Sequence, residues 1–244
     1  MIQTNRNLHG IRVALTGGTS GLGLALMDEL LVRGAAVAFV ARHQRRVAEV
    51  AATRSKVAGI VGDIASKEDI YPLAMQISAL LGGVDVLVNN ASALGPVPLA
   101  LLADTECEDF ETALATNLLG PFRLTRALLG ALTAAAREHG GSVVLNVSSD
   151  AAVEAYPTWG AYGASKAALR HLSRIWDNEL GVQRVRVLSL DPGDMDTPLH
   201  ALAAPGDDPA TLKRPADAAR EFADAIAAAL QALRHPTATE GVQA

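Results

Sequence analysis

Short runs rich in β-branched residues alternate with longer alanine- and leucine-rich stretches along most of this 244-residue chain. Several of the short runs are apolar without strict alternation, as expected of strands that are buried on both faces. The longer stretches have helical spacing and are long enough to cross over between parallel strands. The short runs span residues 11–16, 36–41, 56–63, 84–90, 142–148 and 184–190. The pattern predicts an α/β fold, a doubly wound parallel sheet of about six strands with helices on both faces.

The size of the chain favours a single domain over residues 1–244, because half of the residues are hydrophobic and no linker interrupts the pattern before the last dozen. The net charge of -5 offers no basic surface for nucleic acid. The single cysteine, Cys107, excludes an internal disulfide and fits a reducing compartment. No signal peptide and no membrane-spanning run is evident. We expect a cytoplasmic protein with no membrane or nucleic-acid partner and no metal site.

A glycine-rich turn, "TGGTSGLGLAL", follows the first expected strand and opens the first helix. Glycines at this place allow a tight turn and close approach of a phosphate, and the helix presents free amides and the positive end of its dipole. A glycine-rich turn alone also fits an ordinary tight turn, but its position in a β-α alternation predicts Rossmann-like dinucleotide binding. The residues expected to hold the pyrophosphate are Gly17, Thr19, Ser20, Gly21, Leu22 and Gly23.

The end of the second expected strand, "FVARHQRR", indicates which dinucleotide binds. A site for NAD usually has an acidic residue here that accepts hydrogen bonds from the ribose 2′-hydroxyl. Ala41 stands in that place and Arg42 follows it. A guanidinium grips a 2′-phosphate with charge-assisted hydrogen bonds. The sequence therefore predicts a preference for NADP(H), with Arg42 as the selector and Arg45 or Arg46 either assisting it or simply solvated.

Polar residues also follow the third and fourth expected strands. Asp63, with Ile64 beside it, could accept a hydrogen bond from an adenine amino group or could cap the next helix. Asn89 and Asn90, followed by Ala91, could face the cofactor or tie strands together. We place Asp63, Ile64, Asn90 and Ala91 in the cofactor site, and both readings of Asp63 and of the two amides stay open.

A tyrosine and a lysine, Tyr162 and Lys166, stand four residues apart in "YGASK", so on a helix they share a face. A tyrosine has a pKa of about 10 and is a poor base at neutral pH. An ammonium about 4 Å away contributes about 4 kcal/mol at an effective dielectric of about 20, enough to lower the phenol pKa by about three units. The spacing predicts an acid/base pair, although such pairs also occur on many helix surfaces.

Together the motifs "TGGTSGLG", "NNA", "ATNLLG", "NVSSDAA", "YGASK" and "PGDMDT" occur in this order, and the chain resembles the short-chain dehydrogenase/reductase family in its compact single-domain form. The resemblance runs from about Gly10 to Thr197. It implies hydride transfer between a nicotinamide and a carbonyl or alcohol carbon. One departure is that Ser92 replaces the glycine that often follows "NNA".

The resemblance assigns four catalytic residues. Tyr162 is implied to be the acid/base, and Lys166 to bind the nicotinamide ribose and lower the phenol pKa. Ser149 is implied to polarise the substrate carbonyl, with Ser148 as the competing neighbour. Asn117 is implied to hold a water in a proton relay through Lys166.

The turn "DPGDMDTP" follows the sixth expected strand and could be an ordinary Pro-Gly turn. By resemblance, Pro192 and Gly193 turn the chain over the nicotinamide. The backbone near Met195 and the hydroxyl of Thr197 are implied to bind the carboxamide.

Three segments are expected to border the substrate, at residues 93–102, 151–160 and 194–213, the last being a mobile lid. Their apolar residues, with few charges besides Glu154 and Asp194, favour a largely apolar carbonyl compound. These apolar residues are Leu94, Pro96, Val153, Tyr156, Trp159, Leu199 and Leu202. His200 could touch substrate, although a lone loop histidine is typically solvated.

Members of the family often continue into a seventh strand that supports a tetramer. Here at most Glu240 to Gln243 could form a shortened remnant, so we expect that strand to be shortened or absent. The helices around residues 104–138 and 162–180 could still pair across a two-fold axis, and we predict a homodimer.

The sequence thus favours an NADP(H)-dependent oxidoreductase acting on a carbonyl or secondary alcohol. Two alternatives remain: a reductase of 3-oxoacyl thioesters, and a non-catalytic protein that senses a dinucleotide. The filled positions Asn117, Ser149, Tyr162 and Lys166 disfavour the sensor, which has no need of a proton donor.

Overall fold

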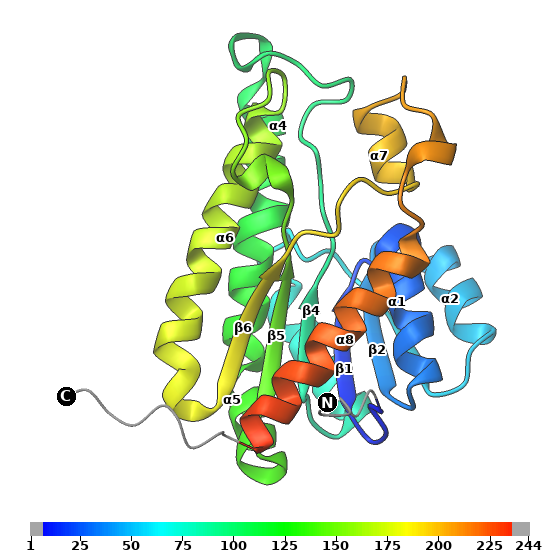
Figure 1. Cartoon of the computed structure of the whole chain (residues 1–244), viewed down its shortest axis with the longest axis vertical. Helices are drawn as coiled ribbons and strands as arrows, with labels where there is room; N and C mark the ends of the chain where they lie inside the picture. Colours follow the sequence, from blue (N-terminus) through cyan, green and yellow to red (C-terminus); the bar gives the residue numbers. More distant parts are fainter. Residues whose placement is uncertain (1–6, 236–244) are drawn as a thin grey trace.

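The structure, a computed structural model, describes residues 7–235 and contains one parallel sheet. All neighbouring strands pair in parallel in the order β3-β2-β1-β4-β5-β6, which confirms the expected doubly wound sheet (Figure 1). The strands are β1 (Arg12–Thr16), β2 (Ala36–Ala41), β3 (Val57–Val61), β4 (Val86–Asn89), β5 (Ser142–Val147) and β6 (Val185–Leu190). Each lies within one of the six expected runs. The shortened seventh strand expected at Glu240 to Gln243 lies outside the described residues.

Helices cover both faces of the sheet, because the side chains of each strand alternate between two apolar clusters. In β1, for example, Val13 and Leu15 face one cluster and Ala14 the other. The helices are α1 (Gly21–Val32), α2 (Gln44–Ala52), α3 (Ile70–Leu81), α4 (Cys107–Leu114), α5 (Gly120–His139), α6 (Gly160–Leu180), α7 (Pro198–Ala203) and α8 (Pro215–Arg234).

One cluster lies under α1 and α8, and the other under α3 and α5. Leu26 of α1 and Phe222 of α8 are fully or almost fully buried in the first, and Leu73 and Leu124 in the second. Within residues 7–235, no helix is long and apolar enough to cross a membrane.

The strand order reverses between β1 and β4, since the chain moves outward to β2 and β3 and then returns to the other side of β1. In such sheets the carboxyl ends of the strands at this reversal leave a crevice for a ligand. The loops after β1, β4, β5 and β6 meet at this end, and α7 lies beside it (Figure 1).

Candidate active site

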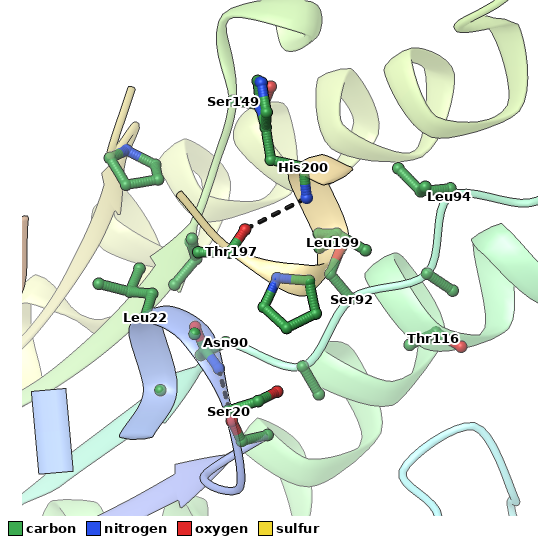
Figure 2. A pocket seen from close by; sticks show the side chains of 18 of the residues that line it. Ser20, Leu22, Asn90, Ser92, Leu94, Thr116, Ser149, Thr197, Leu199 and His200 are labelled. Atoms are coloured by element: carbon green, nitrogen blue, oxygen red, sulfur yellow. Dashed lines mark hydrogen bonds between the residues drawn. The ribbon is translucent and has the colours of Figure 1, made fainter. Parts of the chain in front are cut away.

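A cavity of about 400 Å³ opens at the carboxyl end of the sheet. The turn after β1 borders it with Ser20 and Leu22, the loop after β4 with Ser92 and Leu94, and α7 with His200 (Figure 2). Every residue that we expected in the catalytic and cofactor sites lines this cavity, except Asn117.

Two glycines of the glycine-rich turn, Gly17 and Gly23, have no room for a side chain. A Cβ on Gly23 would lie 2.1 Å from the carbonyl oxygen of Gly17, and one on Gly17 would lie 2.8 Å from Nδ2 of Asn90. Gly21 has a φ of +51°, and a Cβ there would lie 3.3 Å from the methyl carbon of Thr197. The turn therefore presents bare backbone to the cavity, which Thr197 borders from the other side.

The first turn of α1 begins at this backbone. Ser20, its N-cap, is extended and its side chain makes no capping hydrogen bond. The amides of the first turn, which have no partner within a helix, border the cavity together with the positive end of the helix dipole. A pyrophosphate fits this arrangement, because close backbone approach and free amides are what it requires.

Arg42 lies at the edge of the cavity, just after β2. Of the two arginines considered as assistants, Arg45 pairs with Glu49 at 2.8 Å, and neither Arg45 nor Arg46 is among the described residues that line the cavity. The structure thus separates Arg42, which borders the cavity, from its two basic neighbours.

Asp63 lines the cavity and stabilises its own turn, since its Oδ1 accepts a hydrogen bond from the amide of Ala65 at 2.9 Å. It does not cap α3, whose N-cap is Asp69. Asn90 ties strands together by donating to the carbonyl oxygens of Thr16, at 2.9 Å, and Gly17, at 3.1 Å.

The neighbouring Asn89 also ties strands, because its Nδ2 donates to Oδ1 of Asn146 at 2.8 Å. Both asparagines therefore tie strands together, and Asn90 and Ala91 also border the cavity.

Tyr162 and Lys166 lie on α6 and are almost completely buried, with exposures of 7% and 2%. Lys166 Nζ lies 5.5 Å from the centre of the Tyr162 ring and donates to the carbonyl oxygen of Val147 at 2.8 Å. The shared helix face is confirmed.

The expected low phenol pKa is not found. Burial raises the pKa of Tyr162 to about 12, although side-chain hydrogen bonds from Ser149 and Ser92 act to lower it. Burial also lowers the pKa of Lys166 to about 8, against the opposing charge of Asp191. Burial is the largest cause of the raised phenol pKa, because loss of solvent disfavours the charged phenolate.

Ser149 follows β5 and borders the cavity together with Tyr162, whose pKa its hydroxyl acts to lower. Its hydroxyl also donates to Oδ1 of Asp150 at 3.0 Å and accepts from the amide of Ala151 at 3.2 Å. Ser148 lines the cavity as well. The choice of Ser149 over its neighbour therefore stays a prediction.

Asn117 is buried and lies in a π-helical turn, Ala115–Leu119, between α4 and α5. Its Nδ2 donates to the carbonyl oxygen of Ala93, at 2.7 Å, and to Oγ of Ser165, at 2.9 Å. Its Oδ1 accepts from the amide of Ala93 at 2.8 Å. The amide therefore joins the loop after β4 to α6, and its implied part in a water-mediated relay through Lys166 stays a prediction.

The segment expected to be a lid, residues 194–213, contains α7, and backbone pairing joins its two ends. Met195 bridges Lys213, whose amide donates to the carbonyl oxygen of Asp194 at 2.9 Å. The expectation of a solvated His200 is wrong: its ring is only 13% exposed, and its Nε2 lies 2.8 Å from a carboxylate oxygen of Asp207. Sequence spacing gave no signal for this pair.

An apolar wall stands next to the phenol. Tyr162 packs in a cluster with Leu94, Trp159 and Leu199, and its ring lies edge-on to Trp159 at 5.6 Å between centroids. Of the other apolar residues expected at the substrate, Leu202 lines the cavity, but Pro96, Val153 and Tyr156 do not.

Five polar lining residues were not expected in the site: His43, Ser92, Thr116, Asp150 and Asp191. The position of Asp191, directly before Pro192 and Gly193 at the end of β6, was an available signal. Ser92 was noted only as a departure from the family pattern.

A parallel sheet in this order, with a bare-backbone turn and a buried tyrosine–lysine pair at one cavity, defines a nucleotide-binding α/β enzyme fold. A model of the short-chain dehydrogenase family matches residues 12–207. The chain belongs to the short-chain dehydrogenase/reductase family.

Individual relatives support the membership of this family. The 2,5-dichloro-2,5-cyclohexadiene-1,4-diol dehydrogenase of Sphingobium indicum is 34% identical over 202 residues, covering 82% of this chain and 79% of that protein. A 3-ketoacyl-(acyl-carrier-protein) reductase from Brucella melitensis, solved with NADH, is 25% identical with a TM-score of 0.83, covering 90% and 92% of the two chains. A short-chain dehydrogenase from Escherichia coli CFT073, solved with NADPH, is 26% identical with a TM-score of 0.82, covering 90% and 91%.

The protein is accordingly an oxidoreductase of the short-chain type that acts on CH–OH groups, and its fold binds a nicotinamide dinucleotide.

Proposed function

We propose that the protein transfers a hydride between NADP(H) and a largely apolar carbonyl or secondary alcohol. The observation that carries the proposal is the position of the Tyr162 phenol. It lies at a cavity that Ser149 also lines, next to an apolar wall formed by Leu94, Trp159 and Leu199. An apolar carbonyl compound can lie against that wall with its oxygen toward the two hydroxyls.

In the reduction, the bound dinucleotide supplies the hydride to the carbonyl carbon. The phenol of Tyr162 gives its proton to the carbonyl oxygen, and the hydroxyl of Ser149 donates a hydrogen bond to the same oxygen as negative charge develops there. The roles proposed for the ammonium of Lys166, on the same face of α6, are to favour the phenolate and to bind the nicotinamide ribose. Asn117 positions the loop after β4 against α6.

Replacing Tyr162 with phenylalanine tests this assignment. The variant keeps the ring and its packing but loses the proton donor, so we expect kcat on an accepted carbonyl compound to fall at least a hundredfold. NADPH binding, measured by fluorescence titration, should stay within a few-fold of the wild type. Unchanged turnover would remove the catalytic role, and NADPH binding without turnover on any carbonyl panel would favour the dinucleotide sensor.

Arg42 supports the preference for NADP(H), since it borders the cavity at the place where NAD-specific sites usually carry an acid. We expect NADPH to bind at least tenfold more tightly than NADH, a difference of about 1.4 kcal/mol. In Arg42→Ala the affinity for NADPH should fall far more than that for NADH. Arg45→Ala, which breaks only the surface pair with Glu49, is the matched control. Equal losses for both dinucleotides in Arg42→Ala would contradict the selection.

A reductase of 3-oxoacyl thioesters is the second candidate, favoured by the similarity to the Brucella melitensis 3-ketoacyl-(acyl-carrier-protein) reductase. A panel that pairs simple ketones with pantetheine-bearing 3-oxoacyl thioesters separates the two. We further propose a cytoplasmic homodimer that pairs through α4, α5 and α6, which sedimentation at several protein concentrations tests.

A further inference from the structure

The hydroxyl proton of Ser149 is directed to the side chain of the next residue. Ser149 Oγ lies 3.0 Å from Oδ1 of Asp150, and it accepts a hydrogen bond from the amide of Ala151 at 3.2 Å. A carboxylate can only accept and a backbone N–H can only donate, so chemistry fixes the direction of both bonds. A hydroxyl carries one proton, and Ser149 therefore gives it to Asp150.

Two further donors fix the carboxylate of Asp150. Its Oδ1 accepts from the amide of Ala151 at 2.7 Å, and its Oδ2 accepts from the hydroxyl of Tyr156 at 2.8 Å. Asp150 lines the cavity, and the ion pairs among residues 7–235 do not include it. The active site thus contains a carboxylate that depends on hydrogen bonds, and one of its donors is Ser149.

A substrate carbonyl competes with Asp150 for the proton of Ser149. The carbonyl oxygen can only accept, as the carboxylate does, and the hydroxyl has one proton for the two groups. When Ser149 turns to the substrate, the carboxylate loses a donor, which is unfavourable for a charged group. Because both acceptors approach the same hydroxyl, the carbonyl oxygen also comes to lie near the carboxylate. A simple ketone has no proton to offer there.

We propose that the substrate carries a hydrogen-bond donor on the carbon next to the reacting carbonyl, and that Asp150 is the residue that selects it. In the complex, Ser149 donates to the carbonyl oxygen, and the donor of the substrate takes the place of Ser149 at Asp150. The inference rests on the proposed function and narrows its substrate class. An α-hydroxy ketone with an apolar body is the simplest such compound, and a vicinal diol is its counterpart in oxidation.

The other carboxylates of the cavity are placed differently. Asp191 accepts a hydrogen bond from a backbone amide two residues further along, at 2.9 Å. Asp194 lies 3.8 Å from Nδ1 of His200 in the segment that contains α7. Asp150 is the carboxylate bonded to Ser149, so it lies next to the carbonyl that Ser149 is proposed to polarise.

Three matched ketones test the proposal on the wild-type protein. Phenacyl alcohol has a phenyl ring for the wall of Leu94, Trp159 and Leu199, and a hydroxyl beside the carbonyl. Its methyl ether keeps the oxygen but lacks the donor, and acetophenone lacks the whole group, so one control is larger and the other smaller. With NADPH we expect kcat/KM for phenacyl alcohol to exceed both others at least tenfold, because it gains a hydrogen bond to a charged group.

Variants assign the preference to one side chain. In Asp150→Ala the three ketones should have nearly equal kcat/KM, and the value for acetophenone should rise, because Ser149 no longer gives its proton to a carboxylate. A merely structural role would lower the values for all three. Asp150→Asn keeps the size and one acceptor oxygen but loses the charge, so it should show an intermediate preference. Glu154→Ala is the matched control, since it removes an exposed carboxylate of the same loop that does not line the cavity.

Binding provides a second measurement that needs no turnover. NADP⁺ has no hydride to give, so each ketone can be titrated into the mixture of protein and NADP⁺ without reacting. Tryptophan fluorescence reports the binding, because Trp159 is part of the apolar wall. We expect the wild type to bind phenacyl alcohol at least tenfold more tightly than its methyl ether, and Asp150→Ala to lose this difference.

Equal affinities of the wild type for phenacyl alcohol and its methyl ether, no binding of either, or a preference that persists in Asp150→Ala would overturn the inference. Reduction of all three ketones with equal kcat/KM would also overturn it, while the proposed function stands. A binding preference that is lost in Asp150→Ala, without consumption of NADPH on any ketone, would mean the reverse: hydride transfer fails and the selection by Asp150 holds.

Discussion

A single methyl group at Gly23 tests the cofactor turn most directly. Gly23 has an ordinary φ, so alanine there meets no backbone strain, only a collision. Its Cβ would lie 2.1 Å from the carbonyl oxygen of Gly17 and 2.5 Å from Nδ2 of Asn90. Carbon atoms do not approach closer than 3.0 Å, so the turn must open by about 1 Å.

The cost of Gly23→Ala follows from these contacts. Overpacking of this kind costs about 1–3 kcal/mol, and a weakened hydrogen bond from Asn90 to the turn adds about 1 kcal/mol. At about 2–4 °C per kcal/mol for a chain of this size, we expect Tm to fall by about 5–15 °C. Because the displaced backbone is the part that faces the pyrophosphate, NADPH affinity should fall at least tenfold at temperatures where the variant is folded.

The measurements are thermal unfolding, followed by circular dichroism, and NADPH titration, followed by fluorescence. Gly130→Ala is the matched control, since Gly130 lies inside α5 with nothing within 4 Å of the added Cβ, and alanine there should stabilise the helix by up to about 1 kcal/mol. A Gly23→Ala protein with wild-type Tm and wild-type NADPH affinity would refute the account of the turn.

Two buried charges give the remaining predictions. Burial acts against the ionised form of Asp85, but hydrogen bonds from Arg12 and His139 outweigh it and hold the carboxyl pKa below its usual range. The stabilisation by the Asp85 carboxylate is therefore complete above pH 4 and is lost as the pH falls through its lower pKa in the folded state. Asp85→Asn should lower the unfolding free energy, measured in urea at pH 7, by about 3 kcal/mol and should weaken the dependence of stability on acid pH. An unchanged acid dependence would contradict this. Burial lowers the pKa of Lys166 to about 8, so the unfolded chain binds more protons between about pH 8 and pH 10 and stability rises with pH there. Lys166→Met should raise the unfolding free energy at pH 7 by up to about 3 kcal/mol and by much less at pH 10, and a gain independent of pH would point to packing instead.

The strands and the cofactor turn were predictable because their signals are local. Runs that are apolar on both faces, such as residues 142–148, indicate buried parallel strands wherever the rest of the chain lies. Glycines directly after the first strand indicate a tight turn with close packing, and the crowding of Gly17 and Gly23 confirms the packing. The helix spacing also placed Tyr162 and Lys166 on one face.

What surrounds those residues was decided by contacts between distant parts of the chain. The hydrogen bonds of Asn117 to Ala93 and Ser165 could not be foreseen from the sequence, because these groups lie on three separate elements. The pairing of His200 with Asp207 spans only seven residues, but it depends on how the chain turns back after α7.

The pKa of Tyr162 is the clearest case. The sequence by itself determined that a phenol and an ammonium share a helix face. Only the tertiary structure decided that burial, two carboxylates and two serine hydroxyls act on that phenol, and that burial dominates. The physical reason is that spacing along one helix fixes distances within that helix, whereas loss of solvent depends on everything that packs around it.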